Sequence, residues 1–135
     1  MVRRLIVDTG VLVEFERDRL DPREILGEDD AAIAAISVAE LFVGLARAAG
    51  PARARREARI DVLLNSLPVE HYTPDTARAH ATLIVEAMRS GRSRGSFDLI
   101  IAATAGATRR TVLTTDAAAA FGSLPGVDVR LVSAG

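Results

Sequence analysis

The sequence contains no cysteine and no lysine, and each absence excludes a class of mechanism. Without cysteine there is no disulfide framework, no thiolate zinc site and no thiol nucleophile, and this composition fits a reducing cytoplasm. All 17 basic residues are arginine, so chemistry that needs a lysine side chain is excluded. Aromatic residues are also scarce, and the apolar runs fall far short of the roughly 20 residues that span a membrane. We therefore expect a soluble, cytoplasmic protein that makes no membrane contact.

The length and the charge set further limits. At 135 residues the chain is expected to form one domain, over residues 1–135, with a core that needs neither disulfides nor a structural metal. The formal net charge is −1, so the molecule is not a polycation. Any contact with nucleic acid must then come from a local basic patch.

Short apolar runs alternate with helical patterns along the chain. The runs at residues 5–7, 33–36 and 112–113 lack the alternation of a half-exposed strand, which favours parallel strands covered on both faces. Helical periodicity occupies residues 11–17, 38–48, 52–67, 74–89 and 97–109, and the alanine run 117–120 indicates a short last helix before a strand near 127–132. The sequence therefore predicts a three-layer α/β/α domain with a mostly parallel central sheet of about five strands.

Four acidic residues stand where strands end or helices begin, and each has an ordinary explanation as a helix cap. Asp8 and Asp116 lie at strand-to-helix junctions, where a carboxylate accepts backbone N–H bonds. Glu40 completes an S-x-x-E capping box with Ser37. Asp98 falls in the first turn of an apolar helix, where the helix dipole favours a negative charge.

Considered together, the four acids indicate a cation site. In a parallel sheet covered on both faces, strand C-termini and the following helix N-termini lie on one edge, where ligands bind. Four carboxylates gathered there cannot all stay ionised, because each raises the pKa of its neighbours, and a bound cation resolves the conflict. An all-oxygen ligand set favours Mg²⁺ or Mn²⁺ over zinc. His71 and His80 have no paired ligand spacing and are interpreted as structural.

The four acidic segments carry a family likeness. In order they read IVDTGVLVEF, ISVAELFVGL, SFDLIIAATA and VLTTDAAAAF, and this series resembles the four acidic motifs of PIN-domain ribonucleases. The compact length resembles the VapC-type toxins of type II toxin–antitoxin pairs, and the resemblance spans nearly the whole chain. The fourth motif departs from the family pattern, because four alanines separate its acid from Phe121.

The resemblance implies both the site and its chemistry. The implied catalytic and metal-binding carboxylates, followed by two polar supports, are Asp8, Glu40, Asp98 and Asp116, with Thr9 and Thr115. Asp8 and Asp98 are expected as direct ligands of Mg²⁺ or Mn²⁺, and the other two acids act either through water or at a second, substrate-dependent site. The implied activity is metal-dependent hydrolysis of RNA phosphodiester bonds. The implied partners are an RNA substrate, a VapB-type antitoxin protein and a second copy of the chain.

Two surfaces have alternative interpretations. Three arginines lie in or beside the loop before Asp98 and either hold RNA phosphates at the rim or belong to a solvated loop: Arg89, Arg92 and Arg94. Four arginines share a helix with acids at i,i+4 spacing and are expected on a solvated face: Arg53, Arg55, Arg56 and Arg59. Surplus apolar residues at 38–48 indicate a buried central helix, a dimer face or a groove for a partner.

Rival enzyme classes fit less well. A phosphoacceptor receiver domain and a haloacid-dehalogenase-type phosphatase both normally use a lysine near the site, and this chain has none. No G-x-G-x-x-G follows the first strand, which argues against a dinucleotide-binding domain. A catalytically inactive PIN-like interaction module remains as the alternative, although such a module is expected to lose acids and all four positions are filled.

Overall fold

Five short strands form one sheet in which every neighbouring pair is parallel. The structure is a computed structural model that describes residues 2–91, 95–116 and 121–132. The strands are β1 (Arg4–Val7), β2 (Asp30–Ala34), β3 (Val69–Glu70), β4 (Thr111–Thr114) and β5 (Val129–Leu131), and their order across the sheet is β3-β2-β1-β4-β5. The predicted α/β class with a parallel five-stranded sheet is confirmed.

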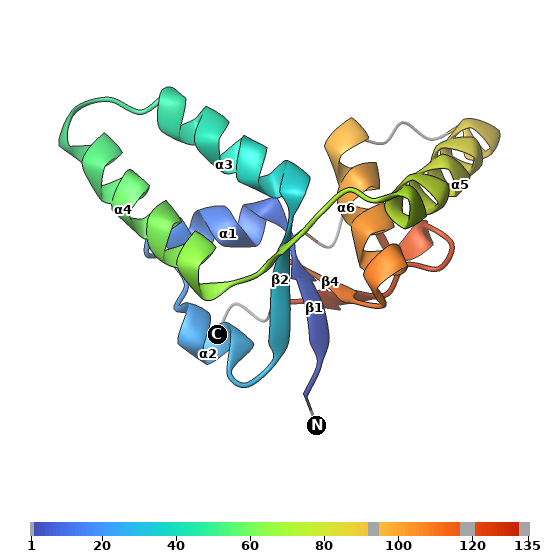
Figure 1. The fold of residues 1–135 in the computed structure, drawn as a ribbon, viewed down its shortest axis with the longest axis horizontal. Coiled ribbons are helices and arrows are strands. Elements are labelled where there is room, and N and C mark those ends of the chain that lie inside the picture. Colours follow the sequence, from blue (N-terminus) through green and yellow to red (C-terminus); the bar gives the residue numbers. More distant parts are fainter. Residues whose placement is uncertain (1, 92–94, 117–120, 133–135) are drawn as a thin grey trace.

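Helices cover both faces of this sheet (Figure 1). On one side lie α1 (Thr9–Glu16), α2 (Pro22–Leu26), α3 (Ala35–Ala46) and α4 (Gly50–Ser66). On the other side lie α5 (Pro74–Ser90) and α6 (Ser96–Thr108), together with the 3₁₀ turn η2 (Phe121–Ser123). None of the helices in the described part of the chain is both long and apolar enough to cross a membrane.

The central strands supply side chains to two separate cores. Leu5 and Val7 pack in the cluster under α1, α3 and α4, whereas Ile6 points the other way into the cluster under α5 and α6. Both clusters are fully enclosed at β1, because successive side chains of a strand face opposite sides of the sheet. The uninterrupted apolar run at the start of the chain therefore reflects a strand buried on both faces.

Several predicted boundaries are correct and others need correction. The sequence predicts a capping threonine at Thr73 and a helix end at Gly91, and in the structure Thr73 caps α5 and Gly91 ends it with a left-handed φ of 65°. The second strand ends at Ala34, and Ala35 begins α3, so the apolar run at 33–36 is half strand and half helix. Alanine and isoleucine suit either state, so only the pairing with β1 and β3 decides where the strand stops. Helix α2 was not predicted, because five residues show no periodicity.

The remaining predictions concern the histidines and the alanine run. The sequence predicts His71 within a strand, but it follows β3 and does not belong to it. His80 lies within α5 as expected, and its Nδ1 is 2.8 Å from the Tyr72 hydroxyl. The helix predicted for residues 117–120 lies outside the described residues.

The prediction of a solvated arginine face on α4 is wrong for Arg56, whereas the Arg59 side chain remains 41% exposed. The Arg56 guanidinium donates from Nε and Nη2 to the Glu16 carboxylate, with a shortest distance of 2.8 Å, and the Glu16 side chain is 0% exposed. Arg59 donates to the Glu16 backbone carbonyl at 3.3 Å. The two arginines therefore tie α4 to the end of α1, a contact between distant segments that i,i+4 spacing cannot reveal.

Candidate active site

The site lies where the sheet changes its direction of winding. From β1 the chain proceeds to β2 on one side, while β4 returns to the other side of β1. Loops leaving the carboxyl ends of two such strands separate and leave a crevice between them. Asp8 directly follows β1, and Thr114 ends β4, so both residues stand at this crevice.

Asp8 is held at both carboxylate oxygens. Its Oδ1 accepts a hydrogen bond from the Thr9 backbone N–H at 2.9 Å, which makes Asp8 the N-cap of α1. Its Oδ2 accepts a hydrogen bond from the buried Thr114 hydroxyl at 2.8 Å. The Asp8 backbone N–H in turn donates to the Leu113 carbonyl at 2.9 Å. Strand β4 thus orients the carboxylate that follows β1.

Glu40 is held from α1 and does not form a capping box. Helix α3 begins at Ala35 behind an Ala34 cap that makes no side-chain hydrogen bond, so Ser37 lies inside the helix. The Thr9 hydroxyl lies 2.8 Å from both Ser37 Oγ and Glu40 Oε1. Because a carboxylate only accepts, Thr9 donates to Glu40. Thr9 therefore supports the second acid, while its backbone N–H supports Asp8.

Asp98 lies in the first turn of α6, whose N-cap is Gly95. An added Cβ at Gly95 would lie 3.1 Å from Asp98 Oδ2, so the glycine leaves room for the carboxylate. Asp98 and Glu40 face the same open hollow of about 450 Å³, together with Gly95, Ser96 and Phe97. The second and third acidic motifs, on α3 and α6, thus come together across this hollow.

The fourth motif supplies a residue that the sequence analysis missed. The Asp116 backbone N–H donates to Thr114 Oγ1 at 3.1 Å, so the Thr114 hydroxyl links Asp8 to Asp116. Thr115, the predicted support, is exposed, and its Oγ1 is 3.9 Å from the position of a Cβ at Gly10. The alternation of side chains along β4 was the available signal, because Thr114 shares a face with Val112.

Electrostatic interactions connect all four acids. Burial raises the pKa of Asp8, the Thr114 hydrogen bond opposes this shift, and the charges of Asp98 and Glu40 raise the pKa further. Burial also raises the pKa of Asp98, and the charge of Asp116 adds to it. Like charges close enough to disfavour one another's ionised forms attract a cation to the same place.

The donor set suits a hard divalent ion. Among the described residues, no three acids or histidines already lie close enough together to hold one ion. Mg²⁺, however, keeps several of its waters and usually takes only one or two carboxylates from a protein. Asp8 and Asp98, which interact with each other and have raised pKa values, are suited to that role. No cysteine or histidine competes at the site.

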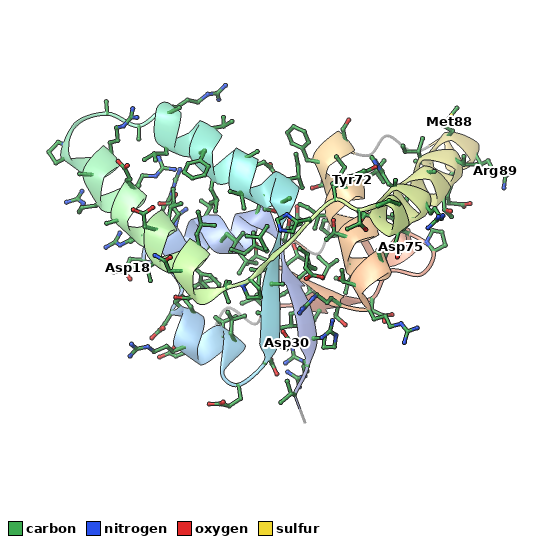
Figure 2. All side chains as sticks on the ribbon, in the orientation of Figure 1. Asp18, Asp30, Tyr72, Asp75, Met88 and Arg89 are labelled. Carbon is green, nitrogen blue, oxygen red and sulfur yellow. The ribbon has the colours of Figure 1, made fainter. Side chains whose placement is uncertain are left out.

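The predicted RNA-binding arginines are only partly described. Arg89 lies at the outer end of α5, on the side of the molecule away from α3 and α4 (Figure 2). Arg92 and Arg94 lie outside the described residues.

The apolar residues of α3 fall into two groups: Leu41 and Leu45 are buried, whereas Phe42 and Val43 are about half exposed.

Comparisons with known proteins show the family to which the chain belongs. The family model of the PIN domain matches residues 5–122. The chain is 32% identical over 130 residues to Ribonuclease VapC4 of Mycobacterium tuberculosis, covering 95% of this chain and 96% of the relative. These matches include all four acidic motifs within their span.

Two solved structures show the same architecture. VapBC-5 of Mycobacterium tuberculosis, described as a member of the VapBC family of toxin–antitoxin systems, superposes with a TM-score of 0.74 at 29% identity, covering 94% of this chain and 95% of that one. VapBC2 of Rickettsia felis, bound to a promoter DNA fragment, reaches 0.83 at 20% identity over 97% and 98% of the two chains. The chain therefore belongs to the PIN-domain family and is a homologue of the VapC ribonuclease toxins.

Proposed function

We propose that the protein is a Mg²⁺- or Mn²⁺-dependent endoribonuclease that acts as the toxin of a toxin–antitoxin pair. The observation that supports this proposal is that hydrogen bonds and one shared hollow connect four acids from four separate segments: Thr114 links Asp8 to Asp116, Thr9 links Asp8 to Glu40, and Glu40 and Asp98 line the same hollow. These acids are Asp8, Glu40, Asp98 and Asp116. The relative named as a ribonuclease supports RNA as the substrate.

In this proposal the three aspartates bind the ion and Glu40 accepts a proton. Asp8 and Asp98 would coordinate the ion directly, and Asp116 would reach it through water. A bound Mg²⁺ or Mn²⁺ neutralises the charge of the scissile phosphate and lowers the pKa of water. Glu40 Oε1 accepts the Thr9 hydrogen bond, and Glu40 Oε2 would take the proton of the attacking water. The water oxygen bonds to phosphorus as the bond to the 3′ oxygen breaks, and the 3′ oxygen takes a proton from solvent, leaving a 5′-phosphate and a 3′-hydroxyl.

The partners follow from the same comparison. VapBC-5 is described as a toxin–antitoxin system, which supports a VapB-type antitoxin protein as the partner of this chain. The exposed apolar side chains on α3 and α5, among them Phe42, Val43, Val85 and Met88, offer surface for an antitoxin segment and for a second copy of the chain. We assign the protein to the cytoplasm, where RNA and antitoxin are found.

Cleavage of total RNA by the purified, antitoxin-free protein tests the proposal. Reactions with Mg²⁺ or Mn²⁺ are run beside EDTA and beside the Asp98→Asn variant, and the 5′ ends of the fragments are mapped. We expect metal-dependent cuts that leave 5′-phosphates and vanish in the variant. Equal cutting by both proteins would show contamination. No cutting with either metal would favour the alternative, an inactive module that binds only its protein partner.

A further inference from the structure

One exposed aromatic side chain borders the acidic hollow. Phe97 precedes Asp98 in the first turn of α6, and 51% of its surface is exposed. Together with Glu40 and Asp98 it lines the hollow between α3 and α6. The Phe97 ring buries only about half of its surface, so it contributes less to the free energy of folding than a fully buried phenylalanine would.

The position of Phe97 follows from the geometry of α6. Residues four apart lie on the same face of a helix, and Ile101, four residues later, is 1% exposed in the core. The face that enters the core at Ile101 thus continues past the sheet edge at Phe97. Placed one turn nearer to the helix N-terminus, the ring stands over the hollow and outside the packed interior.

The other aromatic residues have different surroundings. Phe15 and Phe121 are buried in the two cores. Tyr72 makes an edge contact and a hydrogen bond with His80. Phe42 is 46% exposed on α3 but does not line the hollow. Among the described residues, Phe97 is therefore the aromatic side chain placed at the acids.

We propose that Phe97 is a positioning residue that stacks on the nucleobase next to the scissile phosphate. This inference rests on the proposed ribonuclease function. Among the described residues, the lining of the hollow consists of Glu40, Asp98, Gly95, Ser96 and Phe97, so Phe97 offers the largest apolar surface there to a nucleotide. Every base has a π-face that stacks on an aromatic ring, and this contact needs no charge. Stacking beside Asp98 would fix which phosphate reaches the carboxylates.

The proposal predicts a dependence on one unpaired base. Replacing a stacking aromatic typically weakens binding roughly 5- to 150-fold per base. Purines are expected to be favoured at this position, because sequence preferences of stacking sites come from stacking strength. The same loss is expected when the base is removed from the RNA and the ring is kept.

Binding is measured in the Glu40→Gln background with Mg²⁺, which removes the proposed proton acceptor and keeps both proposed direct ligands of the ion, using a short RNA that carries 2-aminopurine next to the mapped cut. Phe97→Ala and Phe97→Leu should weaken binding roughly 5- to 150-fold and relieve the quenching that stacking causes, whereas Phe97→Trp should restore both. An RNA with an abasic residue at that position should bind the parent protein and its Phe97→Ala variant with equal affinity. Tyr72→Ala, which removes a similarly exposed ring elsewhere, should bind like its parent.

Three outcomes would overturn the proposal. The first is a Phe97→Leu variant that matches the parent protein in affinity and quenching, because the contact would then need only apolar bulk and no aromatic ring. The second is a loss of affinity in Phe97→Ala that is as large on the abasic RNA as on the intact RNA, since a merely structural role of the ring predicts equal losses on both substrates. Absence of RNA binding by the parent would also overturn it. Cleavage by the wild type is assayed separately, so a failed nuclease function would be recognised on its own.

Discussion

The buried ion pair between α1 and α4 provides the sharpest stability prediction. The Glu16 carboxylate is 0% exposed and accepts hydrogen bonds from Arg56 Nε at 3.0 and 3.2 Å and from Nη2 at 2.8 Å. Arg56→Met keeps the length of the side chain and removes its charge, which leaves a buried carboxylate without its main partner. Removing one member of a buried pair costs about 3–5 kcal/mol. Arg17 Nε, 3.8 Å from Glu16 Oε1, compensates in part and places the expected cost near the lower limit.

Chemical and thermal denaturation measure this cost. For a domain of this size a loss of about 3 kcal/mol corresponds to a fall in Tm of roughly 9–15 °C. Arg55→Met, on the exposed face of the same helix, is the matched control and should change stability by less than about 0.5 kcal/mol. The double variant Glu16→Leu with Arg56→Met should recover most of the loss, since apolar side chains can replace a buried pair.

The reasoning would be refuted by a small effect. A loss below about 1 kcal/mol for Arg56→Met, the range of exposed ion pairs, would show that Glu16 reaches water or is satisfied by Arg17 alone. Failure of the double variant to recover stability would show that Arg56 acts through packing. Gly44 matters to the same contact, because a Cβ there would lie 3.0 Å from Arg56 Nη2.

Two further predictions concern the acids. Thr114→Val removes the hydroxyl that donates to Asp8 and should weaken Mn²⁺ binding by roughly 10- to 100-fold in calorimetric titration, whereas Thr115→Val should have little effect; equal affinities of the two variants would contradict the assignment. The raised pKa values of Asp8 and Asp98 mean that the folded, metal-free protein binds more protons than the unfolded chain just above the ordinary aspartate pKa, so its stability should fall as pH rises through that window. Asp98→Asn should therefore raise the Tm of the metal-free protein at neutral pH and flatten its pH dependence, and a lower Tm across that range would contradict this sign.

The inactive-module alternative makes different demands on the same residues. A module that only binds a protein partner has no need to keep the carboxylates of Asp8, Glu40 and Asp98 so close together that their negative charges repel one another. Maintaining partly buried carboxylates with raised pKa values lowers stability unless a cation compensates. The arrangement is therefore explained most directly by an ion-binding function, which the Asp98→Asn measurements test.

Much of the fold was predictable because its signals are local. The apolar run at Leu5–Val7 identified a strand covered on both faces, and Thr73 and Gly91 marked the ends of α5. The apparent capping box of Ser37 and Glu40 misled for the same reason, because a local pattern permits a cap without requiring one. Only the pairing of β2 with its neighbours placed the start of α3 at Ala35, two residues before Ser37.

The sequence by itself determined the chemical types at the site: carboxylates and hydroxyls at strand ends, with no lysine or cysteine to support another chemistry. The tertiary structure decided which of these groups meet. Register pairs Ile6 with Val112, so Asp8 and Thr114, two residues further on, project from the same face of adjacent strands. The folding of α1 against α3 likewise brings the Thr9 hydroxyl to Glu40. Such contacts depend on the relative placement of segments far apart in the chain, which no local pattern specifies.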